Sequence, residues 1–262
     1  MHKRAETYSE FSTWCQAFIS GALDILIIQG SAGVGKSSML KKALYNHSPD
    51  SYCWLEGRIS AVCLFEQCYK YKDRPIYIDD VDSLYSDRQS INLLKLLCQT
   101  EEEKHLQWLT KTTLDNEIPK SFYTTSKACL ITNHWKTLNK HVGAVEDRGL
   151  LLNFTPTKQE VHQYAITQKI CCDQILDFME RHMPLVTQPS LRYYRNAQQL
   201  LSVGLAWQNV LLESFNISLE QETVLQIESE GLPPKKRTIE FVKRTGKSKS
   251  TYYRIKRELA HN

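Results

Sequence analysis

Residues 30–37 read GSAGVGKS, and they directly follow the apolar run Leu26, Ile27 and Ile28. Glycines at positions 30, 33 and 35 allow the backbone to curl with its N–H groups pointing inward, which a side chain with a Cβ would obstruct. A loop of this kind lies between a strand and a helix, and the positive end of that helix adds to the attraction for anions. The pattern therefore predicts a strand–loop–helix unit that binds phosphate groups.

The residue types in this loop predict its contacts. Lys36 is expected to reach the outer phosphates of a nucleotide, and the hydroxyl of Ser37 is expected to ligate a magnesium ion. The predicted cofactors are therefore ATP and Mg²⁺. The predicted nucleotide-binding residues are Gly30, Ser31, Ala32, Gly33, Val34, Gly35, Lys36, Ser37 and Ser38. A chance match is the alternative, and it arises in roughly one chain of this length per hundred.

The fold class follows from the hydrophobic pattern of the first 155 residues. Segments such as 36–46 and 89–99 carry apolar residues at helical spacing, and short apolar runs separate them. Runs that are apolar on both faces are typical of strands in a helix-covered parallel sheet. We expect an α/β, three-layer P-loop core over 1–155, with strands at 25–29, 52–55, 75–78, 128–132 and 150–154.

The strand signal stops near Thr157, and helical patterns follow it. They cover the segments 157–169, 171–182, 191–203 and 205–214. We therefore expect a small helical lid over 156–216, a linker or supporting helix over 217–234, and a short basic helical element over 235–262.

A second acidic motif, PIYIDDVD, lies at residues 75–82, about 45 residues after the loop. An apolar strand that ends in two acids is what a phosphate-loop enzyme needs across from its loop. Asp79 is expected to hold the magnesium ion through water, and Asp80 to orient or deprotonate the attacking water. Asp82 fits better as the cap of a helix that begins at Ser83.

With these two motifs the chain resembles the AAA+ ATPase family over roughly residues 15–215. That family usually has a glutamate where this chain has Asp80, which puts the rate of turnover in question more than nucleotide binding. The resemblance implies a polar sensor residue at the end of a third central strand, and Asn133 matches it. A turn-forming asparagine beyond a strand is the alternative reading of Asn133.

The resemblance also implies an arginine just before the last core strand, which projects into the nucleotide of a neighbouring subunit. Arg148 occupies this place in EDRGLLLNF. Such a residue stabilises charge on the transferring phosphoryl group. It predicts a homo-oligomer in which a monomer is a poor ATPase. An ion pair of Arg148 with Glu146 or Asp147 is the alternative.

Lid helices of this family often carry an arginine that reads the γ-phosphate. Arg192 is the expected residue, and Arg195 competes with it because positions i and i+3 share a helix face. Thr157 with Glu160 is a capping box that starts the first lid helix. Residues 96–122 are long for a plain connection. Lys104, His105, Trp108, Lys111 and Lys120 there suggest an insertion that contacts DNA or a client protein, with an ordinary helix and a packed tryptophan as the alternative.

The C-terminal segment is strongly basic, with ten Lys and Arg against one acid between positions 235 and 257. Ile239 and Val242 give one short helix an apolar side, and Gly246 ends it. Ser248 or Ser250 caps a second helix. Two helices about a glycine turn resemble a helix-turn-helix DNA reader. Its candidate groove residues are Lys247, Lys249, Ser250, Thr251, Tyr253 and Arg254, and its candidate phosphate contacts are Lys243, Arg244, Lys256 and Arg257. A solvated tail or a helix for an acidic partner is the alternative.

Three broader expectations follow from composition. The first ten residues are polar and lack the apolar core of a secretion signal, and no apolar run is long enough to cross a bilayer. Eight scattered cysteines without a C-x-x-C pair indicate reduced thiols. We therefore expect a cytoplasmic protein that has no membrane partner.

The sequence favours a Mg²⁺-dependent ATPase that acts on DNA or a DNA-bound complex, in replication, recombination or transposition of a mobile element, with a possible client protein. The mobile-element step is an analogy between folds. A nucleotide-gated DNA-binding regulator with little turnover is the alternative, favoured by Asp80. A P-loop small-molecule kinase leaves Asn133, Arg148 and the basic segment unexplained.

Overall fold

The computed structural model describes residues 1–110, 114–115, 117–135 and 143–261. It divides into two compact units, Met1–Pro156 and Thr157–Asn262. Among the described residues, no helix has both the length and the apolar character that a membrane span requires. All eight cysteines are free thiols.

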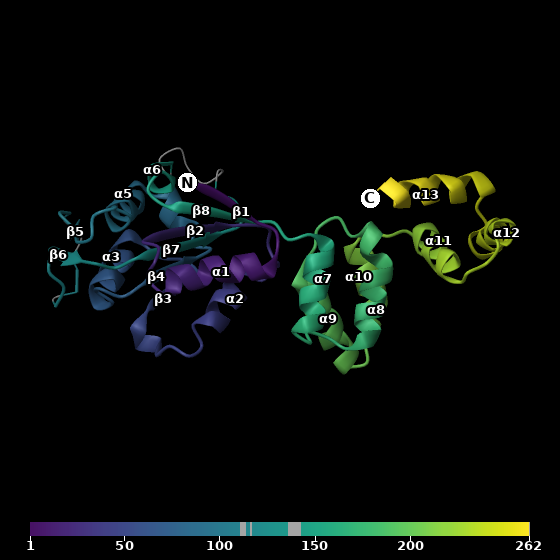
Figure 1. The fold of residues 1–262 in the computed structure, drawn as a ribbon, viewed down its shortest axis with the longest axis horizontal. Coiled ribbons are helices and arrows are strands. Elements are labelled where there is room, and N and C mark those ends of the chain that lie inside the picture. The colour runs from purple at the N-terminus through teal and green to yellow at the C-terminus, as the bar shows by residue number, and fades with distance from the viewer. Residues whose placement is uncertain (111–113, 116, 136–142, 262) are drawn as a thin grey trace. The chain divides into compact units, whose positions relative to one another are not determined.

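The N-terminal unit is built on a six-stranded parallel sheet with the strand order β1-β8-β2-β7-β4-β3 (Figure 1). This confirms the expected α/β fold. Three strands coincide with their predicted ranges, and β3 and β4 each begin one residue later than predicted. The strands are β1 (His2–Ala5), β2 (Ile25–Gln29), β3 (Cys53–Glu56), β4 (Ile76–Asp79), β7 (Ala128–Thr132) and β8 (Leu150–Phe154).

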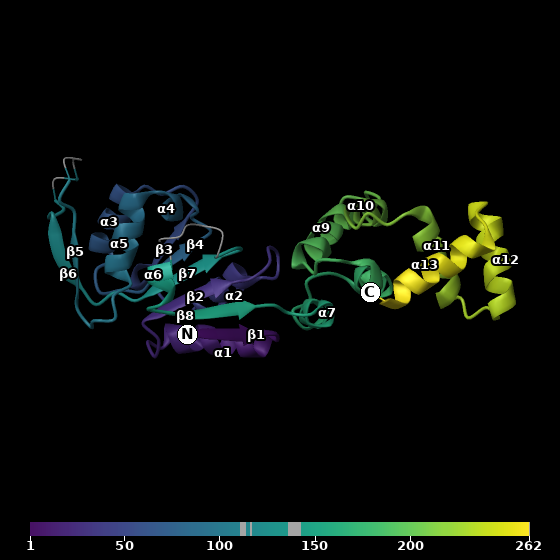
Figure 2. The same ribbon diagram turned by 90° about the horizontal axis from the view of Figure 1, so that it is seen from above.

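Helices cover both faces of this sheet and complete three layers (Figure 2). Ile25 and Ile27 pack in one core with Phe65 and Leu94, so α3 and α5 lie on that face. On the other face, Phe18 of α1 meets Tyr77 edge to face, with ring centroids 5.5 Å apart. The helices are α1 (Tyr8–Ile19), α2 (Lys36–Ala43), α3 (Ala61–Lys70), α4 (Ser83–Ser86), α5 (Arg88–Leu97) and α6 (Gly143–Glu146), with a 3-10 turn η1 (Pro49–Ser51).

The first strand, β1, is not predicted by the sequence. It pairs in parallel with β8 at the edge of the sheet, and three of its four residues are exposed. An edge strand has a single neighbour and buries little, so a polar strand is tolerated there. The apolar signal that identifies the central strands is therefore missing from His2 to Ala5.

A separate antiparallel hairpin, β5 (Lys104–Gln107) with β6 (Ser121–Thr124), follows α5. The helix expected as the plain alternative for 96–122 is wrong, because α5 ends at Leu97 and strand alternation begins at Lys104. Leu106, Trp108 and Phe122 face the core. Lys104 is 2% exposed and donates to the carbonyl of Ser126.

This burial removes two of the residues proposed as surface contacts in the insertion, Lys104 and Trp108. Lys120 is exposed, and the half-buried His105 stacks on Tyr123 with ring centroids 4.3 Å apart. Lys111 lies outside the described residues.

The C-terminal unit is entirely helical over its described residues (Figure 1). Its first part, here called the four-helix segment, comprises α7 (Lys158–Thr167), α8 (Asp173–His182), α9 (Leu191–Ser202) and α10 (Trp207–Ser214), with the 3-10 turn η3 (Met183–Leu185) after α8. Thr157 caps α7 as predicted, because its hydroxyl accepts a hydrogen bond from the amide of Glu160 at 3.2 Å.

The second part, here called the three-helix element, comprises α11 (Leu219–Ser229), α12 (Pro234–Thr245) and α13 (Lys249–His261). The sequence left residues 217–234 open between a linker and a supporting helix, and α11 lies there. Its core consists of Val224 and Ile227 from α11, Phe241 from α12, and Tyr252 and Ile255 from α13.

One detail of this element corrects the sequence analysis. Ile239 does not form the buried side of α12, because its side chain is 58% exposed. Thr238 and Phe241 are the buried residues of that helix. The segment KKRTIEFVKRT offers more than one apolar stripe at helical spacing, and only packing against α11 and α13 selects between them.

Candidate functional site

The phosphate loop lies at the carboxyl end of β2 and leads into α2. Gly33 and Gly35 have φ values of 81° and 94°, a conformation that glycine adopts without steric cost. Gly30 is needed for a different reason, since a Cβ there would overlap the carbonyl oxygen of Phe154 at the end of β8. The hydroxyl of Tyr8 donates to the carbonyl of Val34 at 3.0 Å and braces the loop from α1. Sequence reasoning missed this tyrosine, which no motif signals.

We predict that Gly30→Ala destabilises the protein by about 1–3 kcal/mol, because the added methyl group forces the loop away from β8. Gly143→Ala is the matched control, since a Cβ at Gly143 meets no atom within 4 Å. Urea unfolding of both variants measures the difference. Equal stability of the two variants would show that the close approach to Phe154 does not constrain the loop.

Lys36 is the first residue of α2, and its side chain lies inside the loop. It is 6% exposed, and its ammonium group donates to the carbonyls of Gly30 at 2.6 Å and Ser31 at 3.0 Å. A third bond joins it to the Oδ1 atom of Asn133 at 2.9 Å. The positive charge is therefore held at the mouth of the loop, where a phosphate oxygen could replace these acceptors.

The two acids that follow β4 differ in environment. Asp79 is 8% exposed and accepts a hydrogen bond from the hydroxyl of Ser37 at 2.7 Å. Burial raises the pKa of the Asp79 carboxyl, and the Ser37 bond opposes this shift. A serine hydroxyl beside a carboxylate is an all-oxygen donor pair, which fits Mg²⁺ with phosphate and water as the remaining ligands.

Asp80 is exposed, and its backbone lies in the left-handed region with a φ of 49°. Its amide donates to the carbonyl of Ile131 at 3.0 Å, which fixes this conformation at the end of the ladder with β7. Aspartate and asparagine adopt positive φ more readily than most other residues with a Cβ. The backbone therefore gives a physical reason for aspartate rather than glutamate here.

Asn133, which follows β7, joins the lysine to the second acid. Its Oδ1 accepts from Lys36, and its Nδ2 donates to the Oδ2 atom of Asp80 at 3.1 Å. Strand β7 lies between β2 and β4, so the carboxyl ends of these three parallel strands meet at one edge of the sheet.

The expected helix cap at Asp82 is not formed. Asp82 occupies the position before α4 without a side-chain capping bond.

Arg148 lies elsewhere in the N-terminal unit. It is exposed and lies at the amino edge of the sheet, one residue, Gly149, away from the start of β8, and its guanidinium donates to the carbonyl of Ala144 at 3.1 Å. The alternative ion pair is not formed, because Glu146 instead contacts His2 and Trp135 and no described carboxylate pairs with Arg148. A five-residue strand spans about 16 Å. Arg148 and the phosphate loop of the same chain are thus at opposite edges of the sheet.

The two candidate lid arginines are in α9 of the C-terminal unit. Arg192 and Arg195 are both exposed, and the amide of Arg192 donates to the Ser190 hydroxyl at the start of the helix. The structure does not distinguish between them. Arg192 stays the expected γ-phosphate residue, and Arg195 stays the competing one.

The basic residues of the three-helix element divide into paired and unpaired ones. Lys247 contacts Glu220 at 3.5 Å, and Arg254 contacts Glu258 at 2.9 Å. Arg244 is paired with Glu230 and Glu240, and Lys256 with Glu228. No described carboxylate pairs with the exposed Lys243, Lys249 or Arg257.

The remaining groove candidates lie near the start of α13 or on its surface. Ser250 and Tyr253 are exposed, with Tyr253 at 53%, and Thr251 is half-buried. The hydroxyl of Ser248, not that of Ser250, accepts the amide of Thr251 at the start of the helix.

No model of a known protein family matches the chain. A stretch of it is 39% identical over 98 residues to an uncharacterized 36.7 kDa protein from the nrdC–mobD intergenic region of Enterobacteria phage T4, covering 35% of this chain and 30% of that protein.

Two solved structures are distantly similar. A RuvB mutant of Thermotoga maritima has a TM-score of 0.47 and 11% identity over 98% of this chain and 88% of its own. NtrX from Brucella abortus in complex with ATP has a TM-score of 0.47 and 13% identity over 97% and 69%. These similarities assign no function to the chain.

Proposed function

We propose that this protein is an AAA+ ATPase that binds ATP with Mg²⁺, hydrolyses it between adjacent subunits, and acts on DNA or a DNA-bound complex. The observation that carries the proposal is the meeting of three strand ends at one edge of the sheet. There Ser37 bonds to Asp79, and Lys36 connects through Asn133 to Asp80.

In this mechanism each residue has one task. The amides of residues 30–37 and the N-terminus of α2 bind the phosphates, and Lys36 exchanges its present acceptors for the outer phosphate oxygens. Ser37 and Asp79 would hold the magnesium ion, which supplies charge neutralisation on the phosphates. Asp80 accepts a proton from the attacking water or orients it, and Asn133 holds Asp80 and that water in place.

Arg148 acts in this proposal on the neighbouring subunit's nucleotide. Its position at the edge of the sheet opposite to the phosphate loop supports this assignment, because it cannot serve the loop of its own chain. The function therefore includes a homo-oligomer of adjacent subunits. Arg192 of the four-helix segment, or Arg195 in its place, would report the γ-phosphate.

DNA binding is assigned to the three-helix element. Helices α12 and α13 are joined by the turn Gly246–Ser248 and pack against α11, which supports the proposal of a helix-turn-helix reader. The exposed surface of α13 carries Lys249, Tyr253 and Arg257 at spacings of four residues. By analogy between folds, we propose that the protein acts in replication, recombination or transposition of a mobile element, together with a client protein.

The test of the whole proposal is phosphate release from ATP with and without duplex DNA. Turnover that DNA stimulates is expected. The second candidate function, a nucleotide-gated DNA-binding regulator, is favoured by Asp80 in place of glutamate, because the aspartate side chain is one methylene shorter and reaches less far toward the water. Nucleotide binding with negligible phosphate release under both conditions would select that regulator.

We predict that the double variant Lys249→Ala/Arg257→Ala weakens DNA binding and lowers the slope of log affinity against log salt by about one to two units, because each phosphate contact contributes about one unit. The matched control is Lys3→Ala/Lys72→Ala, two exposed lysines of the N-terminal unit. A fluorescence titration of duplex DNA over a salt series measures both. An unchanged slope would move the DNA site away from α13.

A further inference from the structure

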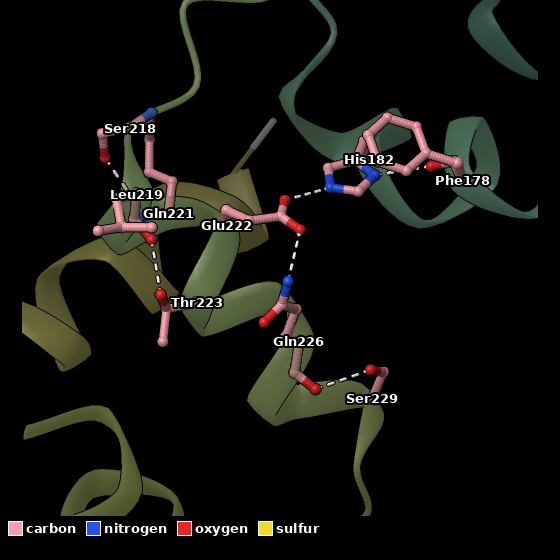
Figure 3. A network of polar contacts seen from close by, with 9 residues as sticks. All are labelled: Phe178, His182, Ser218, Leu219, Gln221, Glu222, Thr223, Gln226 and Ser229. Atoms are coloured by element: carbon pink, nitrogen blue, oxygen red, sulfur yellow. Dashed lines mark hydrogen bonds and ion pairs between the residues drawn. The ribbon is translucent and has the colours of Figure 1, made fainter. Parts of the chain in front are cut away.

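The C-terminal unit contains a buried ion pair between its two parts. His182 is the last residue of α8 and is fully buried, and its Nε2 atom contacts a carboxylate oxygen of Glu222 in α11 (Figure 3). The two residues are 40 positions apart in the sequence. The pair thus connects the four-helix segment to the three-helix element directly.

Both ring nitrogens of His182 have an oxygen atom within hydrogen-bond distance. The Nδ1 atom of His182 lies 2.7 Å from the carbonyl oxygen of Phe178, which only accepts hydrogen bonds, so Nδ1 carries a proton. Burial acts to raise the pKa of the Glu222 carboxyl, but the hydrogen bond and the charge of His182 lower it overall. The hydrogen bond from His182 therefore favours the carboxylate form of Glu222. Arg181 adds further positive charge near Glu222.

Both partners are held in place from several directions. The second oxygen of Glu222 accepts from the side chain of Gln226 at 2.8 Å (Figure 3). The His182 ring stacks on Phe178 with centroids 4.0 Å apart, and Phe178 in turn meets Trp207 of α10. Turn η3, which follows His182, also lies against α13. The pair is therefore the polar centre of a junction that involves α8, α10, α11 and α13.

A buried ion pair often adds little net stability, but it can constrain the relative orientation of the helices that carry it. Well-packed apolar residues of similar volume often serve stability equally well. A pair in which both ring nitrogens and both carboxylate oxygens have hydrogen-bond partners is satisfied only in a narrow range of helix arrangements. Phe215–Ser218, the covalent connection from α10 to α11, contains four residues and does not by itself impose that arrangement.

We infer that His182 and Glu222 are positioning residues that make the four-helix segment and the three-helix element turn as one body, so that the nucleotide state sensed by the first alters the DNA affinity of the second. This inference rests on the proposed function. It assigns to the pair a coupling between two binding events, which is reciprocal by thermodynamic necessity.

The experiment compares full-length Glu222→Ala with Glu213→Ala, a matched control that removes an exposed carboxylate of α10. The measured quantity is the ratio of the Kd values for a random-sequence duplex without nucleotide and with a non-hydrolysable ATP analogue and Mg²⁺. We expect a ratio of at least about fivefold for the wild type and for Glu213→Ala. For Glu222→Ala we expect a ratio within about twofold of one, with nucleotide affinity unchanged.

A second variant covers the case in which Glu222→Ala disrupts folding by leaving the buried polar ring of His182 without its partner. His182→Leu/Glu222→Leu removes both polar partners together and is expected to fold. In this variant hydrogen exchange should rise at the end of α8 and the start of α11, while the N-terminal unit stays protected.

The outcomes separate the inference from the proposed function. A folded double-leucine variant that keeps the wild-type ratio overturns the inference. So does a wild type that binds both nucleotide and DNA with no link between them, and in that case the proposed function stands. A wild type that binds no nucleotide or no DNA overturns both.

Discussion

Lys36→Ala is expected to reduce ATP hydrolysis by at least about 10²–10³-fold, the usual cost of removing one charge-stabilising donor from a reacting centre. The structure gives a specific reason for a large effect. The ammonium group of Lys36 is buried in the loop and makes three hydrogen bonds, one of them to Asn133. Its removal eliminates the cation at the outer phosphates and also disconnects Asn133 from the loop.

The matched control for this prediction is Lys42→Ala, an exposed lysine on the same helix. Initial rates of phosphate release at saturating ATP and Mg²⁺ measure both variants, and titration with a fluorescent nucleotide separates lost binding from lost chemistry. Turnover close to that of the wild type in Lys36→Ala would discredit the phosphate-loop assignment.

Arg148→Ala should keep ATP affinity within about threefold and lose about 10³–10⁵ in turnover, the range for an arginine that stabilises charge on a transferring phosphoryl group. Arg148 lies at the amino edge of the sheet and the phosphate loop at the carboxyl edge. Binding within one chain therefore does not involve this residue, whereas chemistry at the site of a neighbour does. Arg88→Ala, at an exposed position of α5, is the matched control.

A mixture of two inactive variants distinguishes an Arg148 that acts on a neighbouring subunit from one that acts within its own chain. Asp80→Asn lacks the acid but retains a residue that accepts the φ of 49°. Arg148→Ala subunits still have intact acids, and Asp80→Asn subunits still have the arginine, so mixed assemblies contain complete sites. Partial recovery of phosphate release in the mixture is expected. A mixture no more active than its components counts against an arginine that acts between subunits.

The central strands and the site residues could be predicted because their signals are local. Strands β2, β7 and β8 are apolar on both faces, and the loop and the acids are read from short motifs. Their meeting at one edge follows from parallel pairing alone. The contacts that complete the site are not local. Tyr8 and Phe154 lie far from the loop in the sequence, and no motif spacing predicts that they contact it.

The errors also have physical causes. Strand β1 is polar because it lies at an edge, and the hairpin β5–β6 consists of two four-residue strands that alternation marks only weakly. Ile239 was assigned to a core because it is apolar, yet the neighbouring helices select Phe241 instead. Burial of Lys104 likewise follows from the hairpin register and not from its residue type.

Internal ion pairs in the three-helix element have a kinetic consequence. Lys247, Arg244, Arg254 and Lys256 each contact a glutamate of the same element. In the proposed DNA complex, a phosphate would have to displace a carboxylate before it gains these cations. On random sequence the loss of these ion pairs would offset part of each phosphate contact, and residence there would be brief. A protein that leaves the wrong site quickly spends less time trapped during one-dimensional sliding, and its search for a target along a long molecule is faster.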